Sequence, residues 1–346
     1  MQSGIAEEDT DIFPEGDAPE RLEEGLWRIP LPLPFALRAV NVYLIDGGPG
    51  TRVLVDAGLG LAADERALHA GLARAGIGLE DISALVLTHA HPDHIGLAGP
   101  IVSASRAPVY MLAGEIERMY LVWGAHSQGI AADLEAMYAA NGLPRPYQPA
   151  VRASNGGIRR TLRLPPPESV LPVRDEQELA VGGWRYRILW TPGHSDYHCC
   201  LLREDGLLLA GDHVLPRITP NIGFYPRARP DPLGDYFASL ERVAGLPARL
   251  TLPGHRMPFI DLAGRAAELR AHHIERGELV LAALAGQPRG KSAGEVAGPL
   301  FGERLRTADD WRFAVAETLA HLEHLRLRGV VRRRTRDGLV RYAVTA

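Results

Sequence analysis

Four side chains that can bind metal ions lie close together in the stretch THAHPDHIG (88–96): His89, His91, Asp93 and His94. The first two histidines are two positions apart, so in extended backbone they point the same way and can hold one cation. The proline that follows them breaks the strand and helps the chain to turn, so that the last two side chains can face a neighbouring position. A pair of cations needs more ligands than these four.

Three other turns offer the missing ligands: TPGHS with His194, AGDHV with Asp212 and His213, and LPGHR with His255. Each turn follows an apolar run and contains a glycine, which lets the backbone approach closely. An aspartate can bridge two cations through its two oxygens, and mixed imidazole and carboxylate ligation suits Zn, Fe or Mn. Two cations ~3.5–4 Å apart lower the pKa of a bridging water and polarise a carbonyl or phosphoryl oxygen. We therefore expect a hydrolase.

Strands are needed to hold these turns at their ends. Short runs rich in Val, Leu and Ile predict strands in LWRIPLP, NVYLID and TRVLVDAG, and ALVL (84–87) predicts a buried strand before the histidine cluster. Because DGGPG (46–50) joins two strands and precedes no helix, it is interpreted as a hairpin turn rather than a phosphate loop. AADERALHAGLARAGI has apolar residues at helical spacing. Strands resume in QELAVGG, WRYRILWTPGH, YHCCLLRED, LLLAGDHV and ARLTLPGH.

An insert at 113–168 separates these two groups of strands. AGEIERMYLVWGAHSQGIAADLEAMYAANG has helical spacing, and LPRPYQPAVRASNGG after it is interpreted as a loop. The insert predicts either a lid over an apolar pocket at the metals or a helical hairpin whose apolar stripe packs on the core, and we expect both in part. The predicted pocket combines insert residues with residues that follow Asp212: Tyr120, Trp123, Ile222, Phe224 and Tyr225.

Beyond Pro258 the pattern changes to helix, helix, helix and a hairpin that turns at Asp337-Gly338, which is the order of a winged helix. We therefore predict a flexible acidic tail over 1–20, a catalytic domain over 21–262 and a winged-helix-like domain over 263–346.

Composition narrows the class of protein. A net charge of -4 predicts no general attraction to nucleic acid, and no apolar run approaches the ~18 residues that span a bilayer. The N-terminus lacks the order of a signal peptide. The only cysteines, Cys199 and Cys200, are adjacent, so on a strand they point to opposite faces and do not form a disulfide with each other. We expect a cytoplasmic protein with two inert thiols and no membrane partner.

The order His-x-His-x-Asp-His, then His, Asp and His, resembles the metallo-β-lactamase superfamily, and the resemblance covers roughly residues 21–262. It implies an α/β fold, an αββα sandwich with two divalent metal ions at one edge. It also implies the site: His89, His91 and His194 on the first ion, Asp93, His94 and His255 on the second, Asp212 as the bridge, and Asp56 orienting ligands.

The two cations predict a metal-bound hydroxide as the attacking group, and we expect Asp93 to hold that water while also binding metal. Zinc is the preferred cation, and Fe or Mn remain alternatives. His198 matches no ligand position of the family, and His213 only follows the bridging aspartate, so both are interpreted as structural.

The substrate class follows from departures within the family. The best-known true β-lactamases have an arginine after the aspartate and a cysteine at the bridge, where this chain has His94 and Asp212, which argues against lactam hydrolysis. Flavin-linked diiron reductases have a glutamate where this chain has His91. The pattern is similar to glyoxalase II and its thioesterase relatives, lactonases, tRNA 3′-processing nucleases, and β-lactamase-like proteins with a C-terminal winged helix. The last group matches the whole chain best.

We therefore expect cleavage of a thioester or similar acyl bond of a small molecule. The alternative is a metal-dependent endoribonuclease or phosphodiesterase that holds RNA with its winged helix; the intact ligand set argues against a non-catalytic nucleic-acid binder. The predicted hairpin carries five arginines that favour either a nucleic-acid wing or a solvated edge: Arg332, Arg333, Arg334, Arg336 and Arg341. The helix before it opens acidic and is heavily apolar, so we favour docking on the catalytic domain or a homodimer.

Overall fold

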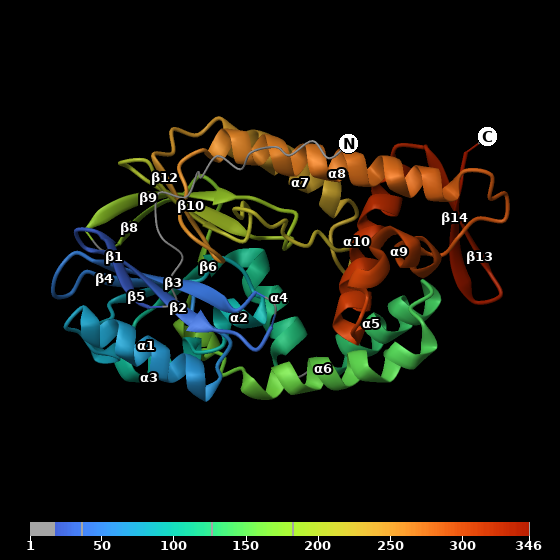
Figure 1. Cartoon of the computed structure of the whole chain (residues 1–346). Helices are drawn as coiled ribbons and strands as arrows, with labels where there is room; N and C mark the ends of the chain where they lie inside the picture. The colour runs from blue at the N-terminus through green and yellow to red at the C-terminus, as the bar shows by residue number, and fades with distance from the viewer. Residues whose placement is uncertain (1–17, 36, 126, 182, 346) are drawn as a thin grey trace.

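The computed structural model describes residues 18–345 except 36, 126 and 182 (Figure 1). Residues 1–17 of the predicted acidic tail lie outside the described residues, and Glu20, at the end of that tail, opens the first strand. Two sheets form the catalytic region. The seven-stranded sheet is antiparallel from β1 to β4 and parallel from β4 to β7. Its strands are β1 (Glu20–Glu23), β2 (Leu26–Pro32), β3 (Ala39–Asp46), β4 (Arg52–Val55), β5 (Ala84–Val86), β6 (Val109–Leu112) and β7 (Val170–Val173).

The second sheet has five strands in the order β12-β11-β10-β9-β8. Its strands are β8 (Glu178–Val181), β9 (Trp184–Trp190), β10 (Cys199–Arg203), β11 (Leu207–Gly211) and β12 (Leu250–Pro253). Strand alternation decides what each face buries. Val42 and Leu44 of β3 pack towards the outer helices, whereas Tyr43 and Ile45 pack towards the other sheet.

Helices cover the outer face of each sheet, which confirms the predicted αββα arrangement (Figure 1). Helices α1 (Ala62–Arg74) and α3 (Ala98–Ser105) pack on the seven-stranded sheet, and α7 (Pro232–Ala244) packs on the other. No helix was predicted over 232–244, where α7 lies. The short helix α2 (Pro92–Ile95) follows β5, and four short 3₁₀ helices complete the described elements: Leu79–Asp81, Arg145–Tyr147, Pro167–Ser169 and Gly302–Arg304.

The two cysteines lie on opposite faces of β10, as predicted. Cys199 is buried between the sheets, Cys200 is buried under the outer helices, and both are free thiols. Burial raises the pKa of both thiols, that of Cys200 to about 12, so both stay protonated and inert near neutral pH.

The insert folds as three helices, α4 (Ala113–Trp123), α5 (Gln128–Ala140) and α6 (Gln148–Thr161). The predicted loop over LPRPYQPAVRASNGG is wrong, because most of it is α6. Its proline lies in the first helical turn, where no backbone N–H is needed. Val151 of α6 and Tyr138 of α5 are buried in one core with the C-terminal helices. The insert is therefore held against protein, as the packing interpretation expects.

The C-terminal region follows the predicted order of helices and hairpin: α8 (Leu262–Leu284), α9 (Ala293–Phe301), α10 (Ala308–Leu327), β13 (Val331–Arg336) and β14 (Leu339–Val344). The hairpin turns at Asp337 and Gly338, both with positive φ. Helix α8 contributes to two cores, with Leu269 packed under the five-stranded sheet and Val280 packed against α10. No described helix combines the length and apolar character needed to cross a bilayer.

Leu269 is fully buried, so Leu269→Ala should lower the free energy of unfolding by about 2–5 kcal/mol through lost burial and a residual cavity. Leu279→Ala on the same helix should change it by less than about 0.5 kcal/mol, because that side chain is 48% exposed. Urea unfolding of both variants measures the difference. Equal destabilisation by the two substitutions would contradict the packing described for α8.

Candidate metal centre

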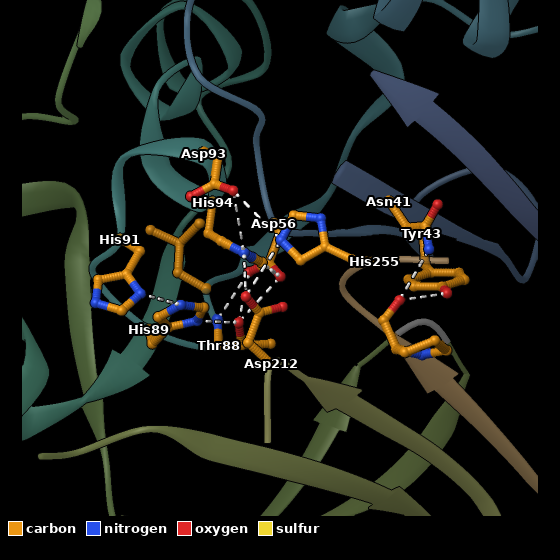
Figure 2. Close-up of polar contacts among 12 residues, drawn as sticks. Asn41, Tyr43, Asp56, Thr88, His89, His91, Asp93, His94, Asp212 and His255 are labelled. Carbon is orange, nitrogen blue, oxygen red and sulfur yellow. Dashed lines mark hydrogen bonds and ion pairs between the residues drawn. The ribbon is translucent and has the colours of Figure 1, made fainter. Parts of the chain in front are cut away.

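Five loops that follow strands converge at one edge of the sandwich. Figure 2 shows the side chains that come from the loops of Asp56, His91, Asp212 and His255. β4 and β5 are parallel in one sheet, β11 and β12 are parallel in the other, and β9 runs in the same direction because both it and β11 are antiparallel to β10. Their carboxyl ends therefore point to the same edge. The residues that follow these ends are Asp56, His89 to His94, His194, Asp212 and His255.

The first cluster consists of three imidazole nitrogens. The Nδ1 atom of His91 lies 3.0 Å from Nε2 of His89 and 2.8 Å from Nε2 of His194. Burial lowers the pKa of all three side chains, so each imidazole is neutral and has a free lone pair. Nitrogens ~2.0–2.1 Å from one tetrahedral zinc ion would lie about 3.3 Å apart, so a small expansion of this cluster would accommodate a cation.

The second cluster combines imidazole and carboxylate. The Oδ2 atom of Asp93 lies 3.9 Å from Nε2 of His94 and 3.4 Å from Nε2 of His255. The Oδ2 atom of Asp212 lies 3.5 Å from Nε2 of His94, 3.5 Å from Nε2 of His194 and 3.2 Å from Nε2 of His255. One carboxylate oxygen thus faces both clusters, which is the place that the sequence analysis gave to a bridging ligand.

The unpaired atoms of this site fit bound cations. Nε2 of His94, Nε2 of His255 and Oδ1 of Asp212 are buried without a hydrogen-bond partner, which is costly unless a ligand satisfies them. Burial opposes charge on both histidines, but Asp212 and neighbouring carboxylates raise the pKa of His94 and raise that of His255 to about 10. Protons on these two imidazoles balance the carboxylates, and divalent cations would replace them. The donor set therefore fits one cation in each cluster.

Two histidines are oriented by a hydrogen bond at Nδ1, which leaves Nε2 directed at the clusters, as is usual for metal ligands. Asp56 accepts from Nδ1 of His94 at 2.8 Å and from the backbone N–H of Thr88 at 2.8 Å, in the orienting position predicted for it. Nδ1 of His255 donates to the carbonyl of Ala39 at 2.7 Å. The turn before His255 is held in addition by Tyr43, whose hydroxyl donates to the carbonyl of Pro253 at 2.8 Å (Figure 2).

His198 holds the backbone of the bridging aspartate. Its Nε2 accepts from the N–H of Asp212 at 3.1 Å, so its Nδ1 carries the proton and donates to the hydroxyl of Thr191 at 2.8 Å. Gly211 has a φ of +48°, and a Cβ atom there would lie 2.5 Å from Nε2 of His198, so glycine is required. His213 is fully buried and packs its ring against Tyr236. Both placements agree with the structural roles expected for these histidines.

Glu115 is a buried residue that the sequence analysis did not identify. Its carboxylate accepts from the N–H of Ala90 at 2.7 Å, the hydroxyl of Ser195 at 2.5 Å and the N–H of Tyr197 at 3.1 Å. It therefore ties the loop of the first two histidine ligands to the loop of His194. A single glutamate at the start of a predicted helix gave no local signal for this role.

The predicted pocket residues lie in two different surroundings. Tyr120 and Trp123 pack on the core of the seven-stranded sheet, and Nε1 of Trp123 donates to the carbonyl of Ala90 at 2.8 Å, beside the metal ligands. Phe224 and Tyr225 pack on the C-terminal core. Ile222 is fully buried under the five-stranded sheet, so it packs within the protein rather than lining a pocket.

A separate group of potential ligands lies in the C-terminal region: His272, His273 and Glu317. Nε of Arg276 is 3.8 Å from Oε1 of Glu317, and Nδ2 of Asn221 is 3.3 Å from its Oε2. The guanidinium already supplies the positive charge here, so we assign no cation to this group.

Comparisons with known proteins agree with this geometry. The family model of the metallo-beta-lactamase superfamily matches residues 36–255, and the model of the metallo-beta-lactamase-like C-terminal domain matches residues 278–345. The chain is 30% identical to the probable metallo-hydrolase YqjP of Bacillus subtilis (strain 168) over 246 residues, which are 69% of this chain and 74% of that protein.

Two crystal structures resemble almost the whole chain. The metallo-beta-lactamase family protein TTHA1429 of Thermus thermophilus is 38% identical, with a TM-score of 0.83 over 94% of this chain and 100% of that one. A beta-lactamase domain protein of Burkholderia ambifaria is 30% identical, with a TM-score of 0.84 over 97% of this chain and 96% of that one.

Replacing a ligand of each cluster tests the metal centre. His91→Ala removes one nitrogen of the first cluster, and Asp212→Ala removes the oxygen shared by both, so each should reduce the metal bound per chain and abolish hydrolytic turnover. Elemental analysis after zinc loading and desalting measures the metal. His69→Ala is the control, because it removes an exposed imidazole elsewhere. Wild-type metal content in the two ligand variants would refute the assignment.

Proposed function

This chain belongs to the metallo-beta-lactamase superfamily, and we propose that this metallo-hydrolase holds two divalent cations and cleaves a thioester or similar acyl bond of a small molecule. The observation that carries the proposal is the position of Oδ2 of Asp212 between the imidazole cluster and the mixed cluster. Zinc suits both donor sets, and iron or manganese are alternatives. When bound, the cations would supply a nucleophile from water near neutral pH and polarise the substrate carbonyl.

Asp93 is the residue suited to orient the attacking water. Its side chain is 17% exposed, compared with 7% for Asp212 and 0% for His94, so it is the most accessible of the three. Although burial acts in the opposite direction, His94 and His255 lower the pKa of Asp93 to about 2. The carboxylate therefore stays ionised and directs the water by accepting a hydrogen bond, rather than storing its proton.

An activated acyl bond suits a site of this composition. The imidazoles and carboxylates of the two clusters would all be bound to metal, so none of them could donate a proton to the leaving group. A substrate whose leaving group departs as a stable anion is therefore favoured. A thiolate meets this condition, because an ordinary thiol has a pKa of ~8.5.

The packing of α10 also supports a small-molecule substrate over RNA. This helix, in the place of a recognition helix, has ten consecutive buried residues from Ala314 to Glu323, so its faces contact protein. Two hairpin arginines are paired within the chain, Arg333 with Glu323 and Arg341 with Glu295. Arg334 is exposed on the hairpin and could contact a phosphate, so RNA is the second candidate substrate.

A substrate comparison at two salt concentrations tests the proposal. Zinc-loaded protein should hydrolyse a neutral acyl-thioester at a rate that barely changes between about 50 and 200 mM salt, while His91→Ala should be inactive. RNA binding through several phosphate contacts would weaken by about 10³-fold or more over that range. Cleavage of single-stranded RNA alone, with this salt dependence and with loss of activity in Arg334→Ala, would replace the proposal by the second candidate.

A further inference from the structure

His194 belongs to the metal centre, but the atom that orients it lies in a loop reaching towards the C-terminal region. Its Nε2 faces the clusters, and its Nδ1 donates to the backbone carbonyl of Asn221 at 2.9 Å. An imidazole with one nitrogen on a metal is held in rotation by the hydrogen bond of the other. The position of the Asn221 carbonyl therefore sets the direction in which His194 offers its lone pair.

The part of the loop around Asn221 is anchored on α10. Nδ2 of Asn221 donates to Oε2 of Glu317 at 3.3 Å and lies 3.4 Å from the carbonyl of Phe313. Three residues later, the N–H of Phe224 donates to the carbonyl of Ala316 at 3.0 Å. The hydroxyl of Tyr225 closes the loop by donating to Oδ1 of Asn221 at 3.2 Å.

Glu317 is a firm anchor because it is itself enclosed. Only 9% of the residue is exposed, and Arg276 of α8 approaches its other oxygen at 3.8 Å. The carboxylate is thus held by its own helix α10 and by Arg276 of α8, and its other oxygen accepts from Asn221.

The other three histidines with one nitrogen held from behind depend on the catalytic region alone. Nδ1 of His89 lies 3.0 Å from the hydroxyl of Thr88. His94 is held by Asp56, which follows β4, and His255 is held by the carbonyl of Ala39 in β3. Resting on the proposed metal centre, we infer that the C-terminal region completes it: Asn221 and Glu317 are positioning residues that fix the orientation of His194.

An exchange of the two polar groups tests this inference. Asn221→Asp keeps the backbone carbonyl but replaces the side-chain donor by a carboxylate facing Glu317, which repels the loop from α10. The affinity for the ion held by His194 should therefore fall about 10-fold, the lower end of the loss caused by removing the hydrogen-bond partner of a metal ligand. Glu317→Gln retains an acceptor and should stay within about 3-fold of wild type. In the double variant the new amide donates to the new carboxylate, so most of the affinity should return.

Zinc dissociation constants from chelator competition, with the visible spectrum of the cobalt-loaded protein, measure the effect at the metal. Thermal unfolding of the metal-free protein measures stability separately. Glu323→Gln is the matched control: Glu323 is buried on the same helix but accepts from Arg333 and Tyr342 at the hairpin, so it should alter unfolding without altering metal affinity.

Three results would overturn the inference. The first is an Asn221→Asp variant that unfolds earlier but binds both ions with wild-type affinity. The second is an equal loss in Glu317→Gln, or no recovery in the double variant, because either means that the hydrogen bond is not responsible. The third is a wild-type chain that binds no transition metal, which removes the proposed function as well, whereas the first two leave it standing.

Discussion

The buried charge of Asp212 is the constraint on which the rest of the site depends. Removing a carboxylate from water costs several kcal/mol of free energy, unless opposite charges or hydrogen bonds compensate for the lost hydration. Here three imidazoles from three loops lie within 3.5 Å of one oxygen, and the second oxygen has no hydrogen-bond partner. The first oxygen is compensated only when all these loops converge, and the second oxygen still needs a bound cation. The fold and the ligand set therefore depend on each other.

Side chains with like charges and lone pairs repel one another at such short distances, so a rigid scaffold is needed to hold them together. Hydrogen bonds from neighbouring residues provide this rigidity. Asp56 adopts a φ of +65°, which costs energy for a residue with a side chain, and in return accepts from Thr88 and His94. His198 fixes the backbone of Asp212, and Glu115 fixes two ligand loops together. This pre-organisation keeps the donors separated and directed, so that a cation enters a site that is already shaped.

The sequence predicted the ligand turns because each is a local pattern, a short apolar strand followed by a glycine-containing turn. The pattern also predicted the order of the C-terminal elements, and the family resemblance implied the sandwich. The sequence could not predict Glu115, because this carboxylate acts on Ala90 and Ser195, which are 25 and 80 positions away. The prolines and glycines of 143–157 favour a loop locally, whereas burial of Val151 against distant helices stabilises α6.

Contacts between distant parts of the sequence join the C-terminal region to the rest of the protein. A nucleic-acid module on a tether would keep its own core and leave its recognition helix exposed. Here α8 contributes to the core under the five-stranded sheet and to the C-terminal core, and the insert shares the latter. Separating the two regions would expose both cores and release the loop that orients His194. The C-terminal helices are therefore part of the catalytic unit, and the hairpin is their solvent-facing edge.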